Sequence, residues 1–289
     1  MSEYLSPCKV NLMLNILGRR PDGFHDLETL FLPVPVYDRI EISREETPFQ
    51  FTCSTDKIPT GPENLVYRAA MGFFARAQIE PRGKIHLVKN LPSEAGLGGG
   101  SANAAVTLKS LNQEFGNPLS ANDLHELATP LGSDVPFFLL DAPAIGRGRG
   151  EKLIELPRFK VLENVWILLM KPDFGVSTGW AYKALANYPV HQKGRPGRVE
   201  EFVEALSSFT LKEAAPLFYN SLEAPVLAEY PILAEYQKFL RENGADVTLM
   251  SGSGSTTFAL ISDPAQAKRL PDLLRERFGG NMWIASAKL

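Results

Sequence analysis

The chain has 289 residues, of which 44% are hydrophobic and 22% charged, a composition that excludes a disordered chain and allows one large or two moderate domains. The formal net charge of −3, without a basic tail, disfavours broad binding to nucleic acid or to an anionic membrane. The two cysteines indicate neither a disulfide framework nor a zinc site, and no stretch reaches the roughly 18 apolar residues of a membrane helix. We therefore expect a cytoplasmic protein.

Strands and helices alternate along the chain without regular βαβ repetition, which predicts an α+β fold with mixed or antiparallel sheets. The first half is expected to contain strands at 9–17, 39–43, 49–53 and 83–91 and helices at 64–78, at 101–115 and from Ser120. The second half is expected to contain strands at 165–170, 246–250, 256–262 and 282–287 and helices near 178–187, 199–207, 231–243 and 264–277. The polar segment 188–198 is the expected mobile loop.

The strongest local signal is the segment PSEAGLGGGSANAA, which begins at Pro92 between a predicted strand and a predicted helix. Its glycines allow positive φ angles and let a ligand approach the backbone without a Cβ clash. The helix after Ser101 offers free N–H groups and the positive end of its dipole, so a nucleotide triphosphate is the expected ligand. The segment fits neither Walker A, which needs a lysine after the last glycine, nor the dinucleotide GxGxxG pattern.

The glycine-rich segment closely resembles the phosphate loop of the GHMP kinases, the superfamily of galactokinase and of homoserine, mevalonate and phosphomevalonate kinases. SPCKVN, RPDGFH, ENLVYRAA, GSDVPFF, GVST and SGSGST follow in the family's order, so the resemblance covers nearly the whole chain. It implies an N-terminal ATP-binding domain like ribosomal protein S5 domain 2 over residues 1–160 and a ferredoxin-like domain over 161–289. It also implies an active site in the cleft between the two domains.

The resemblance further implies that ATP and Mg²⁺ bind at the glycine-rich segment. The residues expected at the nucleotide are Pro92, Gly96, Leu97, Gly98, Gly99, Gly100, Ser101 and Asn103. Ser101 is also the expected contact to Mg²⁺. The adenine is expected near Asn64 and Lys89. Without the resemblance, Lys89 would be interpreted as an ordinary exposed lysine.

Two residues are expected to carry the chemistry. Phosphoryl transfer to an alcohol needs alignment, charge neutralisation and a group that takes the hydroxyl proton. By itself, Asp134 would be interpreted as a capping residue at a helix start, where Ser133 is also a possible cap. However, GSDVPFF matches the family's catalytic aspartate segment. Lys9 shares a predicted strand face with Asn11, and the resemblance implies that Lys9 lies beside Asp134 and helps keep it ionised.

The segment RPDGFH resembles one branch of the superfamily, which phosphorylates the 2-hydroxyl of 4-diphosphocytidyl-2-C-methyl-D-erythritol in the non-mevalonate isoprenoid pathway. In that branch an aromatic ring stacks on cytosine and a histidine reads the edge of the base, which implies these roles for Phe24 and His25. Phe24 stands where tyrosine is usual, and stacking needs only the ring face. The other expected substrate residues are Asn11, Thr178, Tyr182, Gly252, Ser253 and Gly254. Tyr182 could equally be a core residue.

The sequence therefore predicts a small-molecule kinase, present as a monomer or a weak homodimer, whose partners are ATP and the cytidylyl methylerythritol substrate. A GHMP kinase for mevalonate, phosphomevalonate or homoserine is the nearest alternative, and RPDGFH disfavours it. A binding module that has lost turnover is disfavoured by the intact Lys9 and Asp134. An RNA-binding S5-like module is disfavoured by the net charge of −3.

Overall fold

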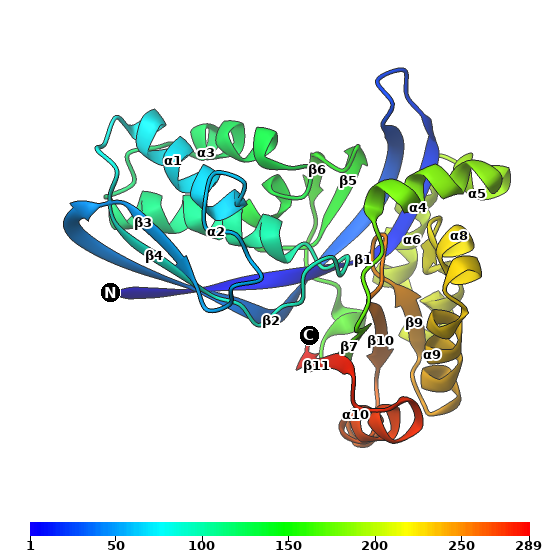
Figure 1. Cartoon of the computed structure of the whole chain (residues 1–289). Coiled ribbons are helices and arrows are strands. Elements are labelled where there is room, and N and C mark those ends of the chain that lie inside the picture. The colour runs from blue at the N-terminus through cyan, green and yellow to red at the C-terminus, as the bar shows by residue number, and fades with distance from the viewer. The chain divides into compact units, whose positions relative to one another are not determined.

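A computed structural model describes residues 1–289 as an α+β protein in which two compact units interleave along the chain (Figure 1). The first unit comprises residues 1–8, 37–92 and 98–141. The second unit comprises residues 9–36, 93–97 and 142–289. These units are defined by backbone packing, and the division into family domains at residue 160 stays a prediction. Strands β1 (Ser2–Arg19) and β2 (His25–Pro48) each contribute residues to both units.

The sheet of the first unit is built from β3 (Gln50–Cys53), β4 (Arg82–Val88) and the later part of β2. Strand β4 runs antiparallel to β2, with Val88 opposite Arg39, and parallel to β3. Helices α1 (Leu65–Ala77), α2 (Gly99–Glu114) and α3 (Ala121–Ala128) lie on one side of this sheet (Figure 1). Two single turns of 3-10 helix follow, η1 (Thr129–Leu131) and η2 (Pro136–Leu139).

The helices of the first unit begin and end where local chemistry dictates. Asn64 caps α1 by accepting a hydrogen bond from the Val66 N–H, and Ser120 forms a capping box with Asp123 at the start of α3. Helix α1 packs against α2, and the fully buried Phe73 of α1 lies 5.9 Å, between ring centroids, from Phe115 at the end of α2. The helices predicted at 64–78 and 101–115 are therefore confirmed within two residues at each end.

In the second unit, strands of the seven-stranded sheet pair in the order β6-β5-β2-β1-β8. This part of the sheet uses β5 (Ala144–Gly148), β6 (Lys152–Glu155) and β8 (Tyr219–Asn220) besides β1 and β2. Both faces of β1 are covered, because Val10 and Leu12 are fully buried while Lys9 and Asn11 on the opposite face are only 4% and 3% exposed. The sequence predicts a strand at 9–17 with one buried face, whereas the observed strand is longer and buried on both faces. Because the polar face is also buried, its side chains need hydrogen-bond partners.

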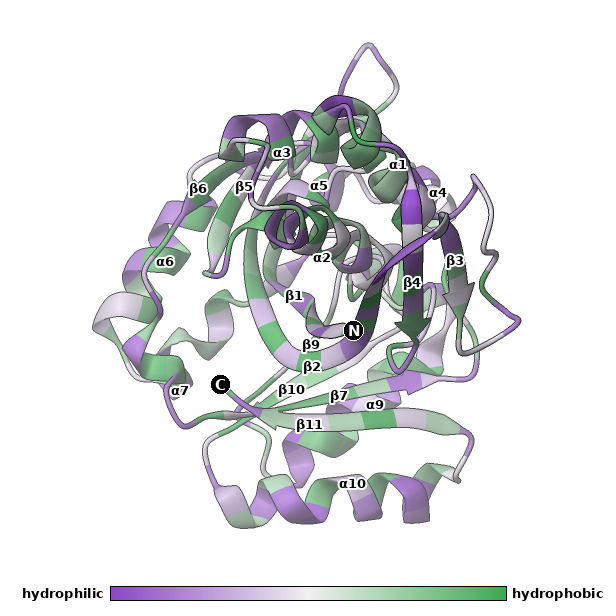
Figure 2. Ribbon diagram, turned by 90° about the vertical axis from the view of Figure 1, so that its left-hand side faces the viewer, coloured by the Kyte–Doolittle hydropathy of each residue, from purple (hydrophilic) through white to green (hydrophobic).

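A second, antiparallel sheet has the order β11-β7-β10-β9. Its strands are β7 (Trp166–Pro172), β9 (Val247–Met250), β10 (Thr257–Ile261) and β11 (Met282–Lys288). Leu168, Met170 and Ala259 of this sheet share a core with residues of α8 (Glu223–Glu229), α9 (Pro231–Glu242) and α10 (Pro264–Phe278). Figure 2 shows hydrophobic residues along β7 and β10 and a mixture of both kinds along α10, as amphipathic packing requires.

The remaining helices of the second unit are short. They are η3 (Lys160–Leu162), α4 (Thr178–Ala184), η4 (Leu185–Asn187), α5 (Pro189–Gln192), α6 (Arg198–Ser208), α7 (Leu211–Ala214) and η5 (Ala215–Leu217). The segment 188–198, expected to be mobile, contains α5 and is anchored to the sheet: the N–H of Gly194 donates to the Ile16 carbonyl at 2.8 Å and that of Gly197 to Glu28 Oε1 at 3.0 Å. Every helix of the chain is too short or too polar to cross a membrane.

Candidate functional site

The glycine-rich loop opens helix α2 with an uncapped N-terminus. Gly98 is the N-cap residue with φ +68° and has no side chain to cap the helix, and Gly96 has φ +71°. The first helical hydrogen bond runs from the Ala102 N–H to the Gly98 carbonyl, so the preceding N–H groups have no partner within the helix. Positive φ angles followed by free N–H groups at a helix N-terminus form an arrangement that binds phosphate.

A buried charged network lies beneath this helix start. Asp38 is fully buried and accepts hydrogen bonds from Lys89 Nζ at 2.6 Å and Asn103 Nδ2 at 3.0 Å. It also accepts from the N–H groups of Asn90 and Leu91, each at 2.7 Å. The interpretation of Lys89 as an exposed lysine is wrong, because its side chain is only 9% exposed. Lys89 and Asn103 therefore support the loop, and their contact with a nucleotide stays a prediction.

The segment that carries Asp134 lies beside the start of α2. A Cβ on Gly132 would lie 4.0 Å from Ser101 Oγ, and one on Gly100 would lie 4.0 Å from Leu65 at the start of α1, next to Asn64. A helix start does follow Asp134, but it is a four-residue 3-10 turn with Pro136 at its N-terminal end. The expected cap by Ser133 is wrong, because this turn has no side-chain cap. A single turn provides little dipole, so Asp134 is a half-exposed turn residue.

Two glycine loops that are distant in the sequence pack backbone to backbone in the second unit. Ser251 Oγ donates to the Gly96 carbonyl at 2.9 Å, and a Cβ on Gly96 would lie 2.0 Å from the Ser251 carbonyl oxygen. Gly252 follows with φ +58°, and a Cβ there would lie 3.4 Å from Asn11 Oδ1. The N–H of Lys9 donates to the Leu97 carbonyl at 2.9 Å. The structure therefore brings together the SPCKVN, glycine-loop and SGSGST motifs.

A chain of hydrogen bonds fixes the Lys9 side chain. Its Nζ donates to Asn11 Oδ1 at 2.6 Å, Asn11 Nδ2 donates to Thr29 Oγ1 at 2.8 Å, and Thr29 Oγ1 donates to the Met13 carbonyl at 2.6 Å. The Lys9 ammonium also lies 5.4 Å from the centroid of the Phe31 ring. Because both polar ends of the Asn11 amide are used, Asn11 orients Lys9 in this structure.

Sequence reasoning missed Asn220, which holds the second glycine loop. Its Nδ2 donates to the carbonyls of Met250 and Gly252 at 2.8 and 2.7 Å, and its Oδ1 accepts from the Leu222 N–H at 2.9 Å. Asn220 reaches this position because β8 pairs in parallel with β1, placing Asn220 opposite Leu14. A lone asparagine in FYNSLE carries no local signal for this role.

The GVST and SGSGST motifs also meet. Thr178 at the start of α4 shares a 2.8 Å hydrogen bond with Ser253 between their hydroxyl oxygens. Ser177 caps α4 through the Trp180 N–H, which fixes the position of Thr178. Gly254, with φ +83°, completes the loop beside Ser253. The expected substrate residues at 178 and 252–254 therefore form one cluster.

His25 and Tyr182 form a second cluster. Their ring centroids lie 5.1 Å apart with a 37° angle between the ring planes. His25 is 9% exposed, and its Nε2 is buried without a hydrogen-bond partner. Burial, and secondly the charge of Arg19, lowers the pKa of His25. Tyr182 is also half-buried against the core. It therefore packs as a core residue and also lies beside His25, an expected substrate residue.

Phe24 lies next to His25 in the sequence and is 52% exposed. Phe24 belongs to the turn between β1 and β2, where the N–H of Arg20 donates to the Phe24 carbonyl at 2.7 Å. A large apolar ring left exposed at a turn is available to stack on a planar ligand.

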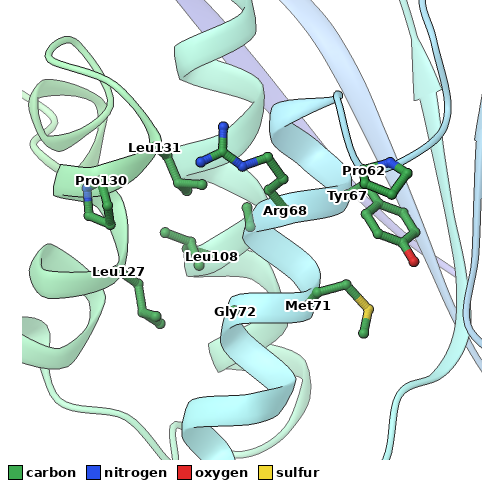
Figure 3. Close-up of a pocket in the computed structure, with 10 residues that line it drawn as sticks. Pro62, Tyr67, Arg68, Met71, Gly72, Leu108, Leu127, Pro130 and Leu131 are labelled. Carbon is green, nitrogen blue, oxygen red and sulfur yellow. The ribbon is translucent and has the colours of Figure 1, made fainter.

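A separate cavity of about 400 Å³ lies between α1, α2, α3 and η1 in the first unit (Figure 3). Its walls are mostly hydrocarbon, with Leu108, Leu127 and Leu131 opposite Met71 of α1, and Arg68 is its one charged residue. Such walls suit an apolar group and not a triphosphate. No group of three or more His, Cys, Asp or Glu side chains gathers to hold a metal ion.

Comparison with protein families matches both parts of the chain. Residues 64–142 match the GHMP kinases N terminal domain, which spans α1, the glycine loop and Asp134. Residues 195–279 match the GHMP kinases C terminal domain, which includes the second glycine loop.

Relatives named 4-diphosphocytidyl-2-C-methyl-D-erythritol kinase match over nearly the full length. The one from Syntrophotalea carbinolica is 39% identical, covering 99% of this chain and 98% of the relative. The one from Geobacter sulfurreducens is 35% identical, covering 98% and 96% respectively.

Solved structures agree with the two-domain fold. A crystal structure of 4-(cytidine 5'-diphospho)-2C-methyl-D-erythritol kinase superposes with a TM-score of 0.80 at 36% identity, covering 99% of this chain and 98% of the other. Homoserine kinase from Cytophaga hutchinsonii shares the fold at 21% identity, with a TM-score of 0.76 over 99% of this chain and 93% of the other. The chain belongs to the GHMP kinase family.

Proposed function

We propose that this protein transfers the γ-phosphoryl group of ATP to the 2-hydroxyl of 4-diphosphocytidyl-2-C-methyl-D-erythritol and releases ADP. The observation that carries the proposal is the meeting of Lys9, both glycine loops and Thr178 in one polar cluster, with the His25–Tyr182 pair in the same unit. Relatives with this activity in their names match over nearly the whole chain.

ATP is the donor in this proposal, as in other kinases of the family, and its phosphates bind at residues 96–101. Support comes from the positive φ angles of Gly96 and Gly98 and from the uncapped start of α2. Mg²⁺ bound with the phosphates would neutralise their charge, with Ser101 as the contact from the protein. Asn64 and Lys89 stand near the adenine in this proposal.

Asp134 takes the proton of the substrate hydroxyl, and Lys9 stabilises the charge that develops beside it. Support for Lys9 comes from the Asn11–Thr29 relay, which holds its ammonium in one orientation. A preorganised cation costs little reorganisation at the moment of transfer. Support for Asp134 comes from its partial exposure and from the closeness of Gly132 to Ser101.

The cytosine lies between Phe24 and Tyr182, with His25 at its hydrogen-bonding edge. The lowered pKa of His25 supports this role, because a neutral imidazole has one nitrogen that donates and one that accepts. The buried Nε2 without a partner is the atom available for this purpose. Gly252, Ser253, Gly254 and Thr178 face the diphosphate of the substrate in this proposal. We further propose a cytoplasmic monomer or weak homodimer.

An ADP-release assay with the cytidylyl substrate tests the proposal directly. We expect Asp134→Asn and Lys9→Ala each to lower turnover by at least about 100-fold, the size of a positioned proton acceptor's contribution, while ATP binding is largely kept. Equal activity on mevalonate or homoserine, which lack the cytidylyl group, would instead favour another kinase of the family. Binding of both ligands without ADP release at any Mg²⁺ concentration would indicate a binding module.

A further inference from the structure

The exposed ring of Phe24 is covered on one face by an arginine from another hairpin. The guanidinium carbon of Arg149 lies 4.5 Å from the centroid of the Phe24 ring. Arg149 itself is half-buried, in the turn between β5 and β6. A guanidinium at this distance from a ring face is held by its attraction to the π electrons.

Strand register places the two residues together. Strand β5 pairs antiparallel with β2, and Gly148 lies opposite Leu27. Continuing this register places Arg149 beside Asp26, at the start of β2 and two residues after Phe24. Figure 1 shows the turn between β1 and β2 projecting from their ribbon, with β5 and β6 beside the ribbon.

The β5–β6 turn is itself well defined, so it can hold the arginine in place. Glu151 Oε2 accepts a hydrogen bond from the Arg149 N–H at 2.6 Å. Gly148 and Gly150 on either side have φ of +69° and +105°, backbone conformations that suit glycine. The Phe24 turn is fixed in turn by Asp22, whose Oδ1 accepts from the Phe24 N–H at 3.1 Å.

We propose that Arg149 is a positioning residue for the substrate: it holds one face of the Phe24 ring so that the opposite face stacks on the pyrimidine of the cytidylyl group. This inference rests on the proposed function. An exposed ring on a projecting turn would otherwise lose conformational freedom when the base binds, and the guanidinium contact reduces that cost in advance.

The test compares Arg149→Ala with wild type in steady-state kinetics. We expect KM for the cytidylyl substrate to rise about two- to tenfold, the cost of ordering one side chain on binding, with kcat and KM for ATP unchanged. Arg149→Lys should retain part of the effect and Arg149→Gln little, because attraction to the ring requires the cation. Arg158→Ala, an exposed arginine on the same unit, serves as the control and should leave all constants unchanged.

A double-mutant cycle with Phe24→Ala separates positioning from direct contact with substrate. If Arg149 acts through the ring, Arg149→Ala has no further effect on KM in the Phe24→Ala background. An equal rise in both backgrounds, or no rise in either, would overturn the inference while leaving the proposed function intact. Equilibrium binding of CDP to the same four proteins should repeat the pattern. Absence of wild-type turnover with the cytidylyl substrate would contradict the proposed function and this inference together.

Discussion

At the scale of single residues, His25 shows how burial sets a protonation state in this protein. Burial and the charge of Arg19 both disfavour the imidazolium, so the pKa of His25 lies below its ordinary value. The histidine is therefore neutral at pH 7, and its buried Nε2 keeps a hydrogen-bonding capacity that the protein leaves unused. A side chain in this condition suits recognition of a base edge better than electrostatic attraction.

This protonation state predicts a contribution of His25 to stability that depends on pH. The unfolded chain takes up the proton near pH 6.5 and the folded chain only at lower pH, so the free energy of unfolding falls as pH drops through this window. Urea unfolding between pH 7.5 and 5 should show a smaller fall for His25→Gln, which has no imidazole, than for wild type. His125→Gln is the control, since His125 lies on the exposed side of α3. Identical pH profiles for wild type and His25→Gln would contradict the assignment.

At the scale of elements, the contact between the two glycine loops determines which glycines are essential. Gly96 has φ +71°, and any side chain there would meet the Ser251 carbonyl oxygen at 2.0 Å. Gly100 belongs to the same motif, yet a Cβ there would meet only Leu65, at 4.0 Å. The two glycines belong to the same sequence motif, but the surroundings of Gly96 exclude a side chain, whereas those of Gly100 have room for one.

We expect Gly96→Ala to lower the free energy of unfolding by at least about 2 kcal/mol, through the clash and the disfavoured φ together. Gly100→Ala should stay within about 1 kcal/mol of wild type, because alanine is the better helix former. Thermal or urea unfolding of the two variants measures the difference. Similar stabilities would mean that the loops do not pack as described.

At the scale of the whole molecule, the expected ligand residues divide between the two units. The expected substrate residues from Asn11 to Gly254 belong to the second unit. Asn64, Lys89, Asp134 and the helix start at 98–101 belong to the first. Each unit therefore contains most of the groups expected to contact one ligand.

This division predicts where each ligand slows hydrogen exchange. With ligand at about 100 times its Kd, CDP should slow backbone exchange mainly within residues 9–36 and 142–289, because groups that contact a ligand open less often. ADP should act mainly within 37–92 and 98–141. Exchange measured by mass spectrometry after separate addition of each nucleotide provides the comparison. Protection by CDP confined to the first unit would contradict the substrate assignment.

The sequence by itself determined the local features. Helices α1 and α2 follow from apolar spacing and from the residues at their ends, and the glycine loop before α2 follows from composition, because each depends on interactions within a few residues. The family's motifs are likewise strings of adjacent residues, and their order along the chain indicates the fold class and the family without the tertiary structure.

Only the tertiary structure decided what depends on residues far apart in the chain. It gave Lys89 a carboxylate partner in Asp38, made the turn at Asp134 too short to provide a helix dipole, and used Asn220 to hold the second glycine loop. It also placed Arg149 against Phe24 through the register of two strands. Burial and strand register arise only when the whole chain packs, so these contacts leave no signal in the neighbouring sequence.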